Sequence, residues 1–375
     1  MRIAMFGQKR IPSREGGVEI VVEELSTRMA VLGHKVTCYN RRGHHVSGSQ
    51  YDTFTEKEYK NVRIKTVPTI EKKGLAAVSS SFFSSLCSLF GRYDVVHIHA
   101  EGPAAFCFIP KLFRKRVVVT VHGLDWQREK WKSGFGAKYI HFGEKMAVKH
   151  ADEIIVLSKG VQRYFMDTYG RETVFIPNGV NRPEIKPADI INKRFGLSKD
   201  SYILYLGRIV PEKGEHYLIE AFKQIDTDKK LVIAGGSSDT DEYMDRLKKM
   251  AQDDERIVFT GFVQGQMLEE LYSNAYMYVL PSDLEGMPLS LLEAMSYGNC
   301  CLVSDIKECT EVIEDKAEVF RKSDVDDLRM RLQELCSRED LVQKYKEDAA
   351  EYICDRYDWN KIVDKTLELY KGERQ

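Results

Sequence analysis

The 375-residue chain lacks the patterns that mark several common classes of protein. It contains no N-x-S/T glycosylation sequon, and its first residues, MRIAMFG, fit a strand rather than a signal peptide. No apolar run approaches the roughly 18 residues that a membrane-spanning helix needs. The eight cysteines form no C-x-x-C pair. These absences predict a cytosolic protein with reduced, core cysteines.

Several catalytic and nucleotide-binding signatures are also missing. The sequence has no H-E-x-x-H, no Cys/His cluster and no G-x-S-x-G, so nothing supports a zinc hydrolase or a serine hydrolase. It also lacks G-x-G-x-x-G, the dinucleotide-binding fingerprint. In the stretch LGRIVPEKG, glycine follows the lysine where a Walker loop requires serine or threonine.

Charge is balanced over the whole chain but not along it. The net charge is −1, yet residues 1–190 carry 30 Lys+Arg against 19 Asp+Glu, and the remainder carries 26 against 38. The basic first half indicates an anionic partner, such as a membrane surface or an acidic ligand. Complementary charge between two domains would give the same pattern.

The chain is longer than one hydrophobic core usually holds, and its pattern of strands and helices occurs twice. The first set of expected strands is RIAMFG, KVTCYN, VRIKTV, DVVHIHA, RVVVTVHG, EIIVLS and TVFIPNG, and the second is YILYLG, KLVIAGG, IVFTG, YMYVLPS and CCLVSD. Nearly continuous apolar strands alternating with helices are typical of buried parallel sheets. VNRPEIKPADI, with two prolines, is the expected linker. We therefore predict an α/β fold with two Rossmann-like, doubly wound domains, residues 1–178 and 186–356.

Ligands of such sheets bind outside the carboxyl ends of the strands. The residues found there are Gly7, His99, His122, Ser158, Asn178, Gly207, Gly235 and Ser282. A histidine in this position can act as an acid, a base or a hydrogen-bond donor. It can equally be a histidine whose bonds are satisfied within the core or at the surface.

Two stretches near strand ends have residues suited to binding phosphate groups. In LGRIVPEKG, Arg208 and Lys213 stand five residues apart on a turn, and a guanidinium with an ammonium suits a diphosphate. In SREGGVE, Gly16 and Gly17 open a helix whose backbone amides could approach an anion. The alternatives are a solvated basic turn and a plain helix start.

The stretch SDLEGMPLSLLEAMSYGN places two glutamates near one helix. Pro288 fits the first helical position and Gly298 the stop, which predicts a helix from about residue 289 to 297. Ser290 and Glu293 then share a face, while the other positions are apolar. Glu285 lies in the preceding loop. Carboxylates can accept two hydrogen bonds from a diol, so a sugar suits this site; the alternative for Glu293 is a surface glutamate.

The spacing of Glu285 and Glu293, with GMPLSLL between them, resembles the E-x₇-E motif of glycosyltransferase family 4. The motifs GGVE, VHG, IPNGV, GR…EKG, AGG and GFV occur in the order of that family, so the resemblance covers nearly the whole chain. It implies a retaining, metal-independent enzyme of GT-B fold, with two domains facing each other across a cleft. It also implies a last helix, about 357–375, that packs back on the first domain. SDIKECTE departs from the commoner Pro-Gly-rich form of its loop.

The resemblance assigns roles to individual residues. It implies that Glu285 meets the donor sugar and Glu293 the ribose of the nucleotide. The residues it implies for catalysis are His122, Glu285, Arg208 and Lys213. The residues it implies for donor binding are Gly16, Gly17, Asn178, Gly207, Phe262, Val263, Met287, Pro288, Leu289, Ser290 and Glu293. No metal or other cofactor is implied.

The acceptor is the least defined part of the prediction. His99, Asp125 and Trp126 are its candidates, and the first domain also carries Trp131 and the basic runs QKR, NRRGHH and KLFRKR. These suit an anionic bilayer presenting a lipid-linked glycan or another intermediate of cell-surface polysaccharide synthesis. We expect a cytoplasmic enzyme, peripheral on the membrane, with no nucleic-acid partner. The alternatives are another GT-B enzyme, such as a sugar-nucleotide epimerase, or a non-catalytic module that binds nucleotide sugars.

Overall fold

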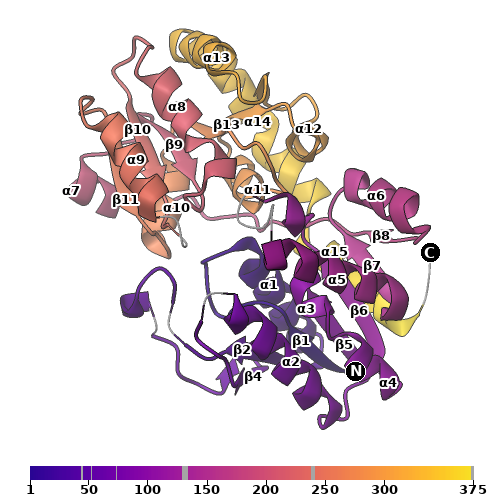
Figure 1. Ribbon diagram of the computed structural model, residues 1–375. Helices are drawn as coiled ribbons and strands as arrows, with labels where there is room; N and C mark the ends of the chain where they lie inside the picture. The colour runs from indigo at the N-terminus through magenta and orange to yellow at the C-terminus, as the bar shows by residue number, and fades with distance from the viewer. Residues whose placement is uncertain (44, 52, 73, 129–133, 238–240, 373–375) are drawn as a thin grey trace. The chain divides into compact units, whose positions relative to one another are not determined.

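A computed structural model describes residues 1–43, 45–51, 53–72, 74–128, 134–237 and 241–372 of the chain. The chain folds into two compact units (Figure 1). The first unit consists of Met1–Asn178 and Trp359–Gln375, and the second unit is Gly179–Asp358. The chain therefore leaves the first unit once and returns to it with its last helix.

The first unit is built on a parallel sheet with one antiparallel edge. Among its described residues the strands lie in the order β3-β4-β2-β1-β5-β6-β7-β8, and only β3 runs antiparallel to its neighbour. They are β1 (Arg2–Phe6), β2 (Lys35–Arg41), β3 (Glu58–Tyr59), β4 (Val62–Val67), β5 (Val95–His99), β6 (Arg116–Val121), β7 (Glu153–Val156) and β8 (Val174–Phe175). The order reverses between β1 and β5, which is where ligands of such sheets bind.

Helices pack against this sheet. They are α1 (Gly17–Val31), α2 (Leu75–Leu89), α3 (Glu101–Ala104), α4 (Phe108–Leu112), α5 (Gly134–His150), α6 (Lys159–Tyr169) and the C-terminal α15 (Trp359–Lys371). Successive side chains of a strand point to opposite faces. In β5, Val96 and Ile98 join the core that includes Ala104 and Ala147, while His97 points to the other face and contacts Tyr370 of α15. Helix α15 also contacts α1.

The second unit contains a wholly parallel sheet among its described residues. The strand order is β11-β10-β9-β12-β13-β14. The strands are β9 (Tyr202–Leu206), β10 (Lys230–Ala234), β11 (Ile257–Gly261), β12 (Met277–Leu280), β13 (Cys300–Ser304) and β14 (Glu318–Phe320). Here the order reverses between β9 and β12. The turns that follow these two strands are therefore neighbours at the carboxyl edge of the sheet.

The helices of the second unit surround a core of aliphatic and aromatic side chains. They are α7 (Ile190–Phe195), α8 (Glu215–Phe222), α9 (Asp241–Ala251), α10 (Gln266–Ser273), α11 (Leu289–Ser296), α12 (Lys307–Ile313), α13 (Val325–Ser337) and α14 (Glu339–Arg356). One core cluster joins Leu218 and Phe222 of α8 to Leu328 and Leu332 of α13. This packing fixes the start of α8, which directly follows the turn that carries Arg208 and Lys213.

The predicted α/β fold with parallel sheets is confirmed. Each of the twelve expected strands is present, and two short strands, β3 and β14, were not anticipated. The eight cysteines are unpaired and most are buried. Within the part of the chain that the structure describes, no helix is long and apolar enough to cross a membrane.

Candidate functional site

The turn after β9 carries the predicted diphosphate-binding cations. Gly207 directly follows β9, and a short 3-10 helix, Pro211–Lys213, leads into α8. Gly214 between them has φ +73°, and an added Cβ would come within 2.1 Å of the carbonyl oxygen of Pro281. Only glycine satisfies both demands. Gly214 therefore lets this turn pass directly against the loop that follows β12.

Glu285 lies in that second loop and bonds directly to Lys213. The Lys213 Nζ donates to Glu285 Oε1 over 2.5 Å, and Ser282 Oγ donates to the same oxygen over 2.8 Å. The side chain of Glu285 is only 7% exposed and that of Lys213 16%, so the pair is largely shielded from water. The sequence placed both residues in one site, and the structure adds that they form an ion pair.

Helix α11 presents Ser290 and Glu293 as predicted. These two side chains are half-buried, whereas the other residues from Leu289 to Ser296 are buried. Pro288 is the N-cap residue rather than the first helical residue, and the helix ends one residue earlier than expected. Both differences are a single residue at a helix boundary, where capping geometry decides the assignment.

Three tyrosines under this edge of the sheet were not anticipated. Tyr278 donates to Ser290 Oγ over 2.8 Å, and Tyr272 donates to Glu293 Oε2 over 3.2 Å. Tyr205 bonds to the Arg208 carbonyl oxygen, 3.1 Å away. All three are buried, and a buried hydroxyl is costly unless it is hydrogen-bonded. Tyrosines within the apolar strands YILYL and MYVL were the signal that could have predicted Tyr205 and Tyr278 as partners, whereas Tyr272 lies in α10.

The remaining predicted donor residues lie around the same edge. Phe262 and Val263 directly follow β11, and Val263 is buried. Met287 and Leu289 are buried at the start of α11. Glu308 of α12 has a raised pKa because it is partly buried and lies near the carboxylates of Glu311 and Glu285. This edge of the second unit therefore gathers two cations, several carboxylates and a helix N-terminus.

In the first unit, His99 and His122 are in direct contact. The Nδ1 of His99 lies 3.1 Å from the Nε2 of His122, so one N–H is shared between the two rings. Burial, with Arg128 nearby, lowers the pKa of His122 to about 3, and burial also lowers the pKa of His99 well below its usual value. His122 is therefore a neutral imidazole at neutral pH. It can exchange hydrogen bonds with a ligand but does not carry charge.

His97 extends this group of buried histidines. Its Nδ1 lies 2.5 Å from the Tyr370 hydroxyl, and its Nε2 lies 2.7 Å from Thr120 Oγ1. Its ring lies against that of His99, with centroids 4.1 Å apart. The structure thus places His99 as a fully buried neighbour of His122 rather than as a surface group that an acceptor could reach.

Asp125 and Trp126 lie in a 3-10 helix, Asp125–Gln127, that follows β6. The backbone N–H of Asp125 donates to Glu101 Oε2 over 2.8 Å, and the Trp126 ring stacks on His141. Glu101 is buried, and its pKa is raised well above its usual value by burial and by the charges of Asp125 and Glu144. Glu101 therefore supports the acceptor candidates, a role that no motif in the sequence indicates.

Gly16 and Gly17 lie at the start of α1, beyond the end of β1. Gly16 is the N-cap residue, with an extended backbone. An added Cβ at Gly16 would lie 2.6 Å from the carboxylate oxygen Oε2 of Glu19, so this acidic group covers part of the helix start. Asn178, the other predicted donor residue of the first unit, is buried just after β8.

The basic runs of the first unit lie at different edges. KLFRKR leads into β6 at the amino edge of the sheet, away from His99 and His122. In contrast, QKR follows β1, and NRRGHH begins with the last two residues of β2, both at the carboxyl edge. Trp131 and His44 lie outside the described residues. The described residues contain no cluster of His, Cys, Asp or Glu side chains able to hold a metal ion.

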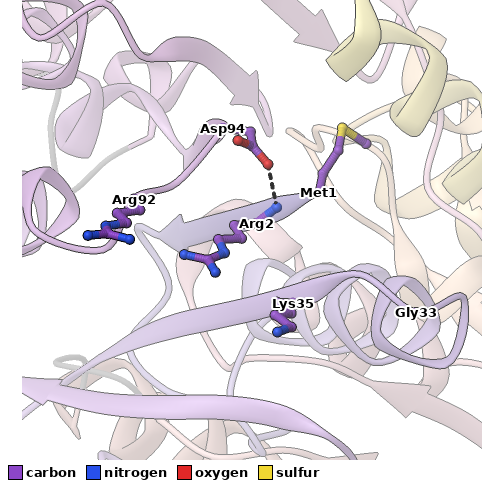
Figure 2. A pocket seen from close by; sticks show the side chains of 6 residues that line it. All are labelled: Met1, Arg2, Gly33, Lys35, Arg92 and Asp94. Carbon is purple, nitrogen blue, oxygen red and sulfur yellow. Dashed lines mark hydrogen bonds between the residues drawn. The ribbon is translucent and has the colours of Figure 1, made fainter.

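A cavity of about 460 Å³ also lies at the amino edge of the first sheet. Figure 2 shows its lining residues, which are Met1, Arg2, Gly33, Lys35, Arg92 and Asp94. The backbone N–H of Arg2 donates to Asp94 Oδ2 over 2.7 Å. The cavity lies at the strand ends opposite those that carry the predicted site residues.

Known proteins resemble this chain in sequence and in fold. Residues 188–373 match the family "Glycosyl transferases group 1", and residues 15–182 match "Glycosyltransferase Family 4". The UDP-Gal:alpha-D-GlcNAc-diphosphoundecaprenol alpha-1,3-galactosyltransferase of Escherichia coli is 27% identical over 83% of the chain and 84% of its own length.

Two solved structures have the same fold. Sucrose-phosphate synthase from Thermosynechococcus elongatus has a TM-score of 0.82 and 21% identity, covering 99% of this chain and 98% of that one. Anabaena HepE in complex with UDP and glucose has a TM-score of 0.81 and 15% identity, covering 99% of both chains.

Proposed function

The chain belongs to the glycosyltransferases of GT-B fold, and on that basis we propose that it is a retaining enzyme that transfers a sugar from a nucleoside diphosphate to a hydroxyl group. The observation that carries the proposal is the ion pair of Lys213 with Glu285 beside Ser290 and Glu293 of α11. Cations for a diphosphate and carboxylates for sugar hydroxyls stand together at the switch point of the second sheet.

The chemistry follows from the residues. As the bond between sugar and diphosphate breaks, negative charge develops on the leaving diphosphate. Arg208, Lys213 and the N-terminal amides of α11 stabilise this charge without a metal ion. A bound diphosphate would also compete with Glu285 for the Lys213 ammonium. That exchange frees the Glu285 carboxylate to accept hydrogen bonds from the sugar.

The other predicted residues take complementary roles in the proposal. Glu293 binds the ribose, because Tyr272 orients its carboxylate at the half-buried face of α11. Phe262 and Val263 lie by the nucleotide base. In the first unit, His122 is the active-site histidine, and its neutral ring suits a hydrogen bond to an uncharged sugar.

A panel of nucleotide sugars tests the proposed activity. Purified protein is incubated with UDP-, GDP-, ADP- and dTDP-linked sugars, with and without monosaccharide and lipid-linked acceptors. We expect release of a nucleoside diphosphate that depends on an acceptor, and a product with the anomeric configuration of the donor. Formation of a donor epimerised at C2 would show that the protein is an epimerase instead. Binding of a nucleotide sugar without turnover would indicate a non-catalytic module. A product of inverted anomeric configuration would contradict retention.

We further propose that the acceptor is presented at an anionic membrane, as a lipid-linked intermediate of polysaccharide synthesis. The E. coli relative is described as acting on a sugar linked to diphosphoundecaprenol, which supports this choice of acceptor. The basic balance of residues 1–190 supports the choice of surface. Helix α5, which begins shortly after Asp125 and Trp126, offers a specific contact.

One face of α5 combines exposed aromatic rings with lysines. Phe135 is 80% exposed and Phe142 50%. Lys138, Lys145 and Lys149 are also exposed. The five residues follow one another at alternating spacings of three and four, which places all five side chains on one face. Glu144, the helix's one acidic residue, is buried and bonds to Tyr164 and Tyr169. An apolar and cationic face without acid suits the surface of an anionic bilayer.

Liposome binding tests this contact. We expect phosphatidylglycerol vesicles to sediment the protein at low salt and to release it as salt shortens the Debye length to roughly 8–10 Å. The double change Phe135→Ser and Phe142→Ser should weaken sedimentation severalfold. Phe90→Ser, at an exposed ring beyond α2, is the matched control and should not. Sedimentation that ignores lipid charge, or an equal loss in the control, would contradict the assignment to α5.

A further inference from the structure

A carboxylate buried beneath the diphosphate-binding turn takes no part in the chemistry described above. Glu215 is the first residue of α8, two positions after Lys213, and it is fully buried. Its Oε1 accepts a hydrogen bond from the Tyr205 hydroxyl over 2.7 Å, and its Oε2 accepts one from the Tyr243 hydroxyl over 3.1 Å. Burying an ionised carboxylate costs free energy even when it is hydrogen-bonded, so a role for Glu215 is expected.

Each of these two hydroxyls has a second possible acceptor. The Tyr205 hydroxyl also lies 3.1 Å from the carbonyl oxygen of Arg208, and the Tyr243 hydroxyl lies 2.8 Å from His216 Nδ1. A tyrosine hydroxyl has one proton to donate. When Glu215 is ionised, its carboxylate competes for both protons.

Protonation of Glu215 reverses one of these bonds. The acid form has an O–H that can donate to the Tyr205 oxygen, and the Tyr205 proton then turns to the Arg208 carbonyl oxygen. The same single proton could instead go to Tyr243, whose own proton then turns to His216. Through Tyr205, the charge on Glu215 is therefore coupled to the backbone that carries the Arg208 guanidinium.

We propose that Glu215 is a positioning residue for the turn Arg208–Lys213, and that the gain of one proton by Glu215 lets Tyr205 hold the Arg208 carbonyl and so favours diphosphate binding. This rests on the proposed function, in which that turn binds the donor diphosphate. Electrostatics act in the same direction, since an ionised Glu215 would repel the bound diphosphate and its acid form would not.

The surroundings place this proton exchange near neutral pH. Burial raises the pKa of Glu215 to about 7, opposed by the hydroxyls of Tyr205 and Tyr243 and by the Lys213 ammonium. His216 has a lowered pKa through burial and the nearby Arg246, with Asp283 and Glu220 acting against this. Helix α13, which also packs on α8, contributes Leu328 and Leu332 to the contact.

The affinity for a nucleoside diphosphate is expected to fall as the pH rises. The acid form of Glu215 predominates below about pH 7 and is lost as the pH rises through that value. The protein should therefore bind a nucleoside diphosphate more weakly at pH 8 than at pH 6. The terminal phosphate of the nucleotide itself ionises near pH 6, so the wild-type profile must be compared with that of a variant.

The experiment measures the dissociation constants of UDP, GDP, ADP and dTDP by calorimetry from pH 6 to pH 8.5, for wild type and Glu215→Gln. Glutamine is always neutral and keeps one donor and one acceptor. For the nucleotide that binds, the ratio of wild-type to variant Kd should be near one at pH 6 and should rise about 3- to 10-fold by pH 8. Taking the ratio cancels the ionisation of the nucleotide.

Matched variants separate positioning from a merely structural role. Glu270→Gln changes an equally buried glutamate in α10 that accepts hydrogen bonds from the backbone of Asp189 and Ile191. For this variant, the ratio of wild-type to variant Kd should not change with pH. If Glu215→Gln fails to fold, Tyr205→Phe and Tyr243→Phe decide the matter. Tyr205→Phe should bind weakly at pH 6 and lose most of the pH-dependent component, keeping only the part due to repulsion by ionised Glu215, whereas Tyr243→Phe should keep the whole component.

The possible failures are distinguishable. A ratio that is constant across the pH range, or equal effects of the two tyrosine variants, would overturn the role of Glu215 and leave the proposed function standing. If the folded wild-type protein bound none of the four nucleotides, the assignment of the diphosphate site would fall, and the role of Glu215 with it.

Discussion

Replacing Arg208 with alanine is expected to lower kcat by about 10²–10³-fold, the loss typical of one missing group that stabilises charge in the transition state. Its backbone is positioned by Tyr205 and by the turn that ends at Gly214. The proposed mechanism assigns the charge on the leaving diphosphate to protein cations, so EDTA should change activity little. Steady-state kinetics on the donor found by the panel, with and without EDTA, measures both effects.

Arg338→Ala is the matched control for this prediction. Arg338 lies between α13 and α14 in the same unit, half-exposed, and pairs with Asp340. Its loss should leave kcat within about twofold, because exposed ion pairs contribute little. Strict dependence on Mg²⁺ or Mn²⁺, or equal losses in the two variants, would show that the diphosphate is held in another way.

We expect Glu285→Gln and Glu293→Gln to impair different kinetic parameters. Glu285 is proposed to face the sugar ring, where bonding changes in the transition state. Its replacement should depress kcat by about 10²-fold and affect donor binding less. Glu293 is proposed to hold the ribose, remote from the reacting carbon. Its replacement should mainly raise KM and weaken nucleoside diphosphate binding by about 10-fold, the value of a charge-assisted hydrogen bond.

The contacts of each carboxylate provide the controls. Tyr272→Phe removes the hydroxyl that donates to Glu293, and it should reproduce a milder form of the Glu293→Gln effect. Donor kinetics and nucleoside diphosphate affinity are measured for all three variants. Weakened nucleotide binding in Glu285→Gln alone would show that the two roles are reversed. No change in any variant would place the site elsewhere.

Periodicity and local chemistry were enough to predict much of this molecule. Buried parallel strands are nearly continuous in apolar residues, so twelve strands were found, including the short β8 within TVFIPNG. In contrast, β3 and β14 lie in stretches without such an apolar run. Pro288 and Gly298 bounded α11, and the spacing of Ser290 and Glu293 then gave the face they share. These features depend on neighbouring residues only, which the sequence displays directly.

The features that were missed depend on residues distant in sequence. Glu215 looked like an ordinary acidic residue at a helix start, and only the arrangement of β9 and α9 shows that it is buried under two tyrosine hydroxyls. The contact of His99 with His122 required β5 and β6 to be neighbours. The ion pair of Lys213 with Glu285 required β9 to lie beside β12.

The return of α15 to the first unit has a consequence for synthesis on the ribosome. Tyr370 bonds to His97, 273 residues earlier in the chain, and the whole second unit is translated between Asn178 and Trp359. At roughly 5–20 residues per second, this interval lasts roughly 10–40 s. During that time the nascent first unit has its strands but not the helix that completes it, and Tyr370, the partner of His97 Nδ1, has not yet been made. The second unit can fold as soon as it emerges, so the domain begun first is the one finished last.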